Sequence, residues 1–162
     1  MDVKKILCTI VMLLMIYIGS LFAQSKPSYT YSISTHTFTS SEGWSVSRGV
    51  YAGGGSVAKG DIFDISHQNN VNSTGVKNFG PLPVGIYLIT KVDGSITTNT
   101  IILEPQFSTW LGRDMDTFRI HGDSIANPGK GSRGCIILGS SDRQKIVDAL
   151  KKNGNLMLTV TR

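Results

Sequence analysis

Short apolar segments alternate with glycine, proline and polar turn residues along most of the chain. Alternation of apolar and polar positions predicts strands, and the segments with this pattern are residues 29–34, 44–51, 86–92, 98–103, 117–121 and 156–160. Asp93-Gly94 predicts a hairpin turn after the third segment. Pro81 and Pro83 restrict the chain before residue 86 and exclude a helix there. The pattern therefore predicts a mostly β fold.

One segment has helical spacing instead. The apolar residues within 146–150 form one face, and two lysines follow at the end where the helix dipole favours positive charge. Ser141 with Gln144 three residues later predicts a capping box at the start, and Gly154 predicts the end. We therefore expect one helix close to the C-terminus.

The N-terminus has the pattern of a targeting segment. A short basic start precedes an almost unbroken apolar run of 17 residues from Ile6 to Phe22, which is typical of a secretory signal peptide. We expect residues 1–23 to be removed and residues 24–162 to form the functional domain. Leu21 stands where a small residue is preferred before a cleavage site, so an uncleaved membrane anchor stays open as the alternative. In both cases the domain is exported, to the periplasm or cell envelope of a bacterium, and only the N-terminal segment, if retained, touches a membrane.

Composition places the rest of the chain among globular single domains. The 162 residues are 40% hydrophobic and 17% charged, which is enough apolar material for one core. The formal charge of +5 falls to +4 without residues 1–23, which carry two lysines and one aspartate. This mild excess fits attraction to an anionic cell-wall polymer. Because the sequence has no cluster of basic residues interleaved with aromatic ones, we expect no nucleic-acid partner.

One cysteine and one histidine are the strongest candidates for chemistry. Cys135 is the single cysteine outside residues 1–23, and such a thiol is buried and inert, paired with another chain, or reactive. It follows Gly134 and precedes an apolar run that would anchor it. A cysteine has an ordinary pKa of about 8.5, so a nucleophilic thiol needs activation. His121, which lies 14 positions upstream at the end of an apolar segment, is placed to accept the thiol proton.

The residues alone leave a structural alternative open. In it, Cys135 is a small core side chain and His121 a hydrogen-bonded structural histidine. The other histidines, His36 and His67, lie in polar or turn-rich segments, and the aspartates near His67 do not have the spacing of metal ligands. We therefore expect no metal site.

Four segments together resemble the YkuD-type L,D-transpeptidases, and most closely the type VI secretion L,D-transpeptidase effectors, a related family of small domains. The resemblance covers roughly residues 28 to 160, and the combined order of the motifs is more specific than any one of them. The segments are Gly80-Pro81-Leu82-Pro83-Val84-Gly85-Ile86-Tyr87, Leu111-Gly112-Arg113, Phe118-Arg119-Ile120-His121-Gly122-Asp123-Ser124 and Ser132-Arg133-Gly134-Cys135-Ile136-Ile137-Leu138.

The resemblance implies a YkuD-like domain, a β-sandwich or barrel-like sheet with one C-terminal helix packed on it. Its nucleophile corresponds to Cys135 and its general base to His121, with the backbone carbonyl of Gly122 as the group that orients the base. Backbone amides near Gly134 and Cys135 would stabilise an oxyanion. The implied activity is that of an L,D-carboxypeptidase, an L,D-transpeptidase that exchanges D-amino acids, or both. The substrates are the tetrapeptide stems of peptidoglycan, and no metal or organic cofactor is needed.

Further residues near these motifs would contact the substrate. Arg113 lies in a segment shared with the family, and an arginine binds a carboxylate through two parallel hydrogen bonds. Asp123 and Ser124 are candidates for orienting the base or for substrate contact. Ser132 would shape the turn before the nucleophile, with direct contact as the alternative. Arg119 either shares a face with the neighbours of His121 or is solvated, and of the two we expect solvation.

Arg133 departs from the family pattern, in which a second histidine usually occupies that position. It would add positive potential beside the thiol and is a further candidate for substrate binding. The departure gives some weight to a non-catalytic wall-binding module with a degenerate site. A second alternative is an antibacterial envelope toxin with the same chemistry, for which an immunity or inhibitor protein would be a partner. The N-terminal segment argues against an injected effector, because such effectors usually lack a signal peptide.

Overall fold

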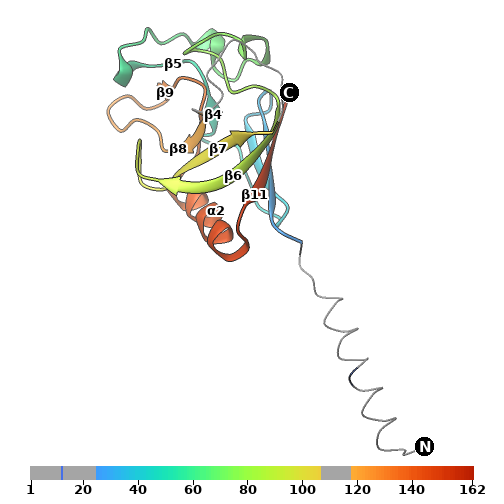
Figure 1. Cartoon of the computed structure of the whole chain (residues 1–162). Coiled ribbons are helices and arrows are strands. Elements are labelled where there is room, and N and C mark those ends of the chain that lie inside the picture. The colour runs from blue at the N-terminus through green and yellow to red at the C-terminus, as the bar shows by residue number, and fades with distance from the viewer. Residues whose placement is uncertain (1–11, 13–24, 107–117) are drawn as a thin grey trace, which may run out of the picture.

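The computed structural model describes residue 12 and residues 25–106 and 118–162 (Figure 1). Nine strands form a curled sheet in the order β3-β2-β1-β11-β6-β7-β8-β10-β4, and β5 and β9 form a separate pair. The strands are β1 (Ser28–Ser32), β2 (Thr37–Ser40), β3 (Ser45–Val46), β4 (Tyr51–Ala52), β5 (Gly55–Ser56), β6 (Gly85–Asp93), β7 (Thr100–Pro105), β8 (Arg119–His121), β9 (Gly131–Ser132), β10 (Ile136–Ile137) and β11 (Leu156–Thr161).

The helical elements are short except for one. Helix α2 (Ser140–Asn153) lies between β10 and β11 and buries Ile146, Val147 and Ala149 in the core beneath the sheet (Figure 1). The 3₁₀ helices are η1 (Val57–Lys59), η2 (Ile65–His67) and η3 (Val71–Ser73), and they lie at the end of the molecule that also carries β5 and β9 (Figure 1). The sheet and α2 are thus one layered unit, with irregular chain gathered over one end of it.

The sheet is antiparallel at its centre and contains two parallel pairs. Strand β6 pairs antiparallel with both β7 and β11, whereas β1 pairs parallel with β11 and β8 with β10. In the last pair, Ile136 lies opposite Ile120 and Ile137 opposite His121. Because parallel neighbours end at the same edge of a sheet, the chain that enters β10 lies beside the chain that enters β8.

The prediction of a mostly β fold with one helix near the C-terminus is confirmed: α2 is the only α-helix within residues 25–106 and 118–162. Five of the six expected strands overlap β1, β6, β7, β8 and β11, and Gly154 ends α2 as expected, with a φ of 70°. The strand expected at residues 44–51 is wrong. This segment is divided between β3 and β4, which lie at opposite edges of the sheet, because Gly49 turns the chain with a φ of 72°.

The predicted capping box is also wrong. Helix α2 begins two residues earlier than expected: Gly139, not Ser141, occupies the N-cap, and no side chain caps this end. Ser141 is therefore inside the first turn. The Gln144 side chain accepts a hydrogen bond from Asn99 Nδ2 at 2.6 Å and donates one to Asp148 at 2.8 Å, so it does not turn back toward the helix start.

Within the described residues, no helix combines the length and the apolar character needed to cross a lipid bilayer. The expected signal peptide or anchor at residues 1–23 falls outside those residues, apart from position 12. The exported location stays a prediction.

Candidate active site

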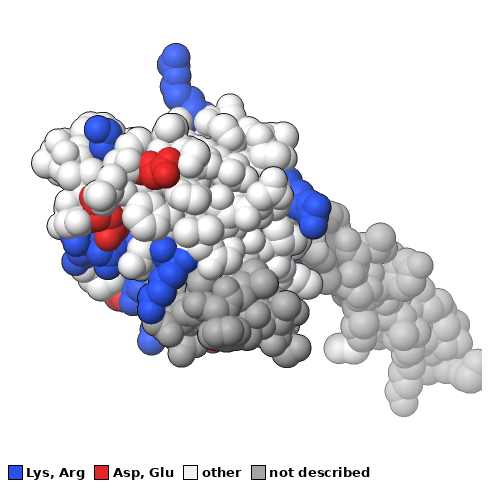
Figure 2. All heavy atoms as spheres, turned by 90° about the horizontal axis from the view of Figure 1, so that it is seen from above, with Lys and Arg blue, Asp and Glu red and all other residues white. Residues whose placement is uncertain are grey.

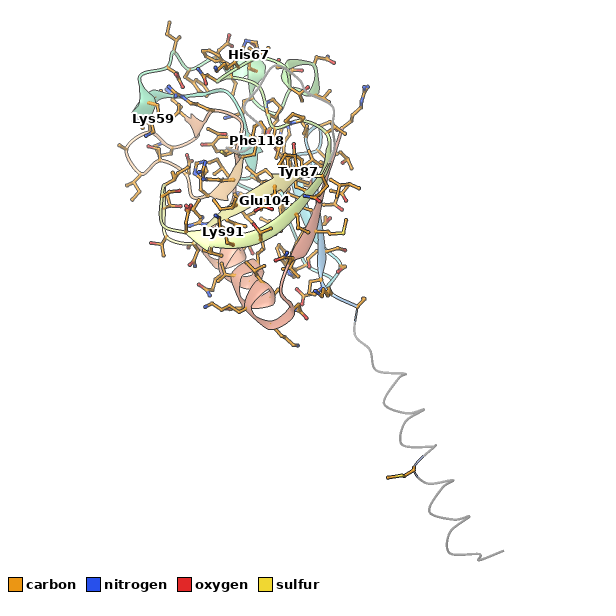
Figure 3. The ribbon with its side chains drawn as sticks, in the orientation of Figure 1. Lys59, His67, Tyr87, Lys91, Glu104 and Phe118 are labelled. Atoms are coloured by element: carbon orange, nitrogen blue, oxygen red, sulfur yellow. The ribbon has the colours of Figure 1, made fainter. Side chains whose placement is uncertain are left out.

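A cavity of about 840 Å³ opens beside the end of β8. Its walls come from segments that are distant in the sequence, at residues 56–59, 77–78, 95–97, 118–125 and 131–135. The Phe118 side chain is 2% exposed and lies inside the molecule, whereas Lys59 reaches its outer edge (Figure 3). The cavity therefore extends from the core to the surface, and both His121 and Cys135 line it.

His121 is the last residue of β8 and is 3% exposed. Its Nδ1 lies 2.7 Å from the carbonyl oxygen of Gly122. A carbonyl only accepts hydrogen bonds, so Nδ1 carries the hydrogen and Nε2 is left as the acceptor of the neutral ring. The Gly122 amide donates to Thr97 Oγ1 at 2.9 Å, which holds the residue whose carbonyl orients the imidazole. The carbonyl expected to orient the base is thus in contact with it.

The surroundings of His121 favour its neutral form. Burial is the largest cause that lowers the pKa of His121, and the positive charges of Arg143 and Arg119 lower it further. The hydrogen bond to Gly122 and the charge of Asp123 act in the opposite direction but do not reverse the shift. The imidazole is therefore neutral at pH 7 and able to accept a proton.

Cys135 lies in the short connection between β9 and β10 and is half-buried. The residue that follows it, Ile136, is fully buried and pairs with β8 opposite Ile120. The apolar run after the cysteine therefore anchors it in the core, as expected. This pairing brings the thiol and His121 to the wall of the same cavity.

Ser132 organises the turn that carries the cysteine. It is 0% exposed, and its Oγ donates to the Cys135 carbonyl at 2.6 Å. The same oxygen accepts from the amide of Gly53 at 3.1 Å and from the amide of Gly134 at 3.0 Å. Gly134 has a φ of 133°, a conformation that favours glycine. The predicted role of Ser132 in shaping the turn thus matches its contacts.

These contacts change one expectation about the oxyanion. Because the Gly134 amide donates to Ser132 Oγ, it is engaged within the turn and is not directed at a substrate carbonyl. The amide of Cys135 stays a prediction as an oxyanion donor.

Replacing Ser132 with alanine is expected to destabilise the protein by about 1–3 kcal/mol, because it leaves two amides and one carbonyl without their buried partner. The measurement is urea denaturation of Ser132→Ala beside Ser47→Ala, a change at an exposed serine. A midpoint for Ser132→Ala equal to that of the control would show that Ser132 does not hold the turn.

Arg133 is bound to an aspartate that lies far away in the sequence. Its Nε donates to Asp61 Oδ2 at 2.7 Å and its Nη2 to Asp61 Oδ1 at 2.6 Å, while Nη2 also donates to the Lys59 carbonyl at 3.1 Å. Asp61 Oδ2 further accepts from the Ser56 amide at 2.9 Å. Arg133 was expected to bind substrate or to raise the potential beside the thiol, but its guanidinium is paired with a carboxylate. Through the Lys59 carbonyl, Arg133 also joins the turn that carries the cysteine to η1.

Asp123 and Ser124 hold the loop that follows His121. The Asp123 carboxylate accepts from Tyr51 Oη and from the amides of Ser124 and Gly129, and Ser124 Oγ accepts from the Asn127 amide at 3.1 Å. Asp123 therefore does not orient the imidazole, whose Nδ1 is turned to Gly122. Both residues line the cavity, so substrate contact stays a prediction for them.

Two further arginines, Arg113 and Arg119, lie in the segments that carry the motifs. Arg113 lies outside the described residues, so its contacts with substrate stay a prediction. Arg119 was expected to be solvated, and this is wrong: it is half-buried and lines the cavity. Side chains in a strand point alternately to either face, which places Arg119 on the same face of β8 as His121.

Arg143 is a residue that the motifs did not indicate. It lies in the first turn of α2, is 5% exposed, and donates from Nη1 to the Leu138 carbonyl and from Nη2 to the Thr98 carbonyl, the latter at 3.0 Å. A Cβ on Gly122 would lie 3.1 Å and 3.2 Å from its two terminal nitrogens. The guanidinium is thus packed directly against the peptide that orients His121.

His67 has a structural environment. Its Nδ1 lies 2.9 Å from Ser73 Oγ and its Nε2 lies 3.7 Å from Asp64. Within residues 25–106 and 118–162, no group of three histidine, cysteine, aspartate or glutamate side chains is arranged to hold a metal ion.

Comparison with known proteins finds no match to the chain among protein-family models, curated proteins or solved structures. The proposal of a function therefore rests on the residues and the geometry of the cavity.

Proposed function

We propose that the protein is a cysteine enzyme of the cell wall that acts on the tetrapeptide stems of peptidoglycan as an L,D-carboxypeptidase, an L,D-transpeptidase, or both. The observation that carries the proposal is the placement of Cys135 and His121 on one cavity, with Nδ1 of the neutral imidazole held by Gly122 and Nε2 left as the acceptor. The motifs that resemble the YkuD-type enzymes supply the substrate class. The Arg133–Asp61 pair supports a formed site, because it accommodates the arginine that departs from the family pattern.

The first step acylates the cysteine. Nε2 of His121 accepts the thiol proton, and the Cys135 sulfur attacks the carbonyl carbon at the L-centre of the third residue of the stem. The amide bond to the terminal D-alanine breaks when the imidazolium returns the proton to the leaving nitrogen. The products are a thioester on Cys135 and free D-alanine.

The second step frees the enzyme. His121 accepts a proton from water or from an incoming amine, which attacks the thioester and displaces the Cys135 thiolate. Water gives a tripeptide stem, whereas an amine gives D-amino acid exchange or a cross-link. The fate of the thioester depends on how well the cavity holds an acceptor and excludes water. The site would act in the periplasm or envelope, where the stems are found.

The test is mass spectrometry of the products formed from disaccharide-tetrapeptide by the full chain, purified in mild detergent. We expect the loss of one alanine residue, and in the presence of a different D-amino acid we expect a product of the corresponding exchanged mass. An unchanged tetrapeptide together with retention of the protein on intact cell-wall sacculi would instead support a non-catalytic wall-binding module.

A further inference from the structure

The charged side chains that line the cavity are mostly cationic. They are Lys59, Lys77, Arg119, Arg133 and one carboxylate, Asp123. The surface viewed in Figure 2 likewise shows more lysine and arginine atoms than acidic ones among the described residues. A cavity with this balance favours a negatively charged ligand.

Contacts within the protein separate these charges into two groups. Arg133 is paired through two nitrogens with Asp61. Asp123 Oδ1 accepts from Tyr51 Oη and the Ser124 amide, and Oδ2 accepts from the Gly129 amide. In contrast, the ion pairs of the described residues include neither Lys59 nor Lys77. Both lysines are exposed at the cavity, so their ammonium groups can reach a bound ligand.

The two lysines come from separate elements. Lys59 is the last residue of η1, and Lys77 lies in the loop between η3 and β6. The backbone carbonyl of Lys59 is held by Arg133, which fixes the base of this side chain beside the turn that carries the cysteine. A lysine side chain is a flexible stem with a compact charge. The two ammonium groups can therefore adjust to an anion bound in the cavity, while the turn that carries the cysteine stays in place.

We propose that Lys59 and Lys77 form an anion subsite at the mouth of the cavity and select stem peptides whose diamino acid carries a free carboxylate over those in which it is amidated. This inference rests on the proposed function, since the stem peptide is the substrate it concerns. The substrate presents a carboxylate on the diamino acid as well as the C-terminal carboxylate. Amidation of the first removes one negative charge and leaves the backbone at the reacting bond unchanged.

The effect of each lysine is modest and depends on salt. An exposed ion pair contributes up to about 1 kcal/mol, which corresponds to about a fivefold change in affinity. At high ionic strength the Debye length shortens and the contribution falls. Selectivity for the free carboxylate should therefore be largest at low salt and should disappear when both lysines are neutralised.

The experiment compares two synthetic tetrapeptides that differ only in whether the diamino-acid carboxylate is free or amidated. Binding is measured calorimetrically on the full chain carrying Cys135→Ala, so that no turnover occurs, and kcat/KM is measured on the chain with its cysteine. Both are repeated with Lys59→Gln, Lys77→Gln and the double variant. The matched control is Lys151→Gln, which neutralises an exposed lysine in the last turn of α2, about 12 Å along the helix from Arg143.

The expected result is about fivefold tighter binding of the free carboxylate by the chain with both lysines, and a ratio near one for the double variant. The control should keep the full ratio. An equal affinity for both peptides, or a preference that survives in the double variant, would overturn the subsite. Tighter binding of the free carboxylate by a chain that turns over neither peptide would keep the subsite and reject the proposed chemistry. Turnover of both peptides at the same rate and with the same affinity would support the proposed chemistry and reject the subsite.

Discussion

Replacement of Cys135 with alanine is expected to abolish release of D-alanine, lowering kcat by at least about a thousandfold, because the Cys135 sulfur forms the thioester on which both steps depend. His121→Ala should lose activity on a similar scale, since the thiol then lacks a proton acceptor and the leaving amine lacks a donor. The two losses should not add in the double variant, because the two groups act as one unit. The measurement is the initial rate of D-alanine release from disaccharide-tetrapeptide.

A matched control separates the loss of catalysis from damage to the fold. His36 lies in a turn with a φ of 54° and is not one of the residues that line the cavity. His36→Asn keeps a residue that tolerates this conformation. This variant should retain full activity. Intact-protein mass spectrometry of the unaltered enzyme during turnover should also show a covalent acyl adduct, and this adduct should be absent from Cys135→Ala. Unchanged D-alanine release by Cys135→Ala would reject the proposed nucleophile.

The long strands of the sheet could be predicted from the sequence because their pattern is complete within each segment. β11 alternates buried and more exposed residues over Leu156–Thr161, and β7 begins with four buried residues in a row. The two-residue strands β3, β4, β5, β9 and β10 could not be predicted in this way. A pair of residues has no period, and these strands exist only through tertiary pairing: β3 with β2, β10 with β8 and β4, and β9 with β5.

The residues of the candidate site could be predicted where the signal lies within one short segment of sequence. His121, Gly122 and Cys135 lie in short motifs, so local sequence indicated them. The partner of Arg133 could not be indicated in this way, because Asp61 is 72 positions away and the pair forms only when η1 packs beside the cysteine turn. The hydrogen bond from the Gly134 amide to Ser132 likewise depends on a backbone conformation that the residue types alone do not specify.

No motif indicates Arg143, but the helical spacing of α2 contains a signal that could have found it. Position 143 stands three, four and seven residues before Ile146, Val147 and Leu150, which is the spacing of one helix face. A charged residue on an apolar face is costly to bury unless it is hydrogen-bonded. An arginine there therefore predicts buried acceptors, and the structure supplies the carbonyls of Leu138 and Thr98.

Loss of the Arg143 side chain is expected to lower kcat by about ten- to a hundredfold, because small displacements of a catalytic group have effects of this size. Arg143 is a positioning residue: it binds the carbonyls of Leu138 and Thr98 and does not lie at the reacting atoms in the proposed mechanism. The Leu138 amide donates to the His121 carbonyl at 3.0 Å, and the Leu138 carbonyl accepts from Arg143. Arg143→Met leaves the two carbonyl acceptors buried and unpaired, so unfolding in urea should also become easier.

The pH profile distinguishes positioning of the base from a purely structural role. Activity requires neutral His121 and therefore falls as the pH falls through the pKa of this residue. Burial is the largest cause that lowers the pKa of His121, and the charge of Arg143 lowers it further. Arg143→Met removes the second cause, so the acid limb of kcat/KM should move to higher pH. Arg143→Lys keeps the charge but not the forked hydrogen bonds, so it should restore the acid limb and only part of kcat. An acid limb unchanged in Arg143→Met would limit Arg143 to a role in stability.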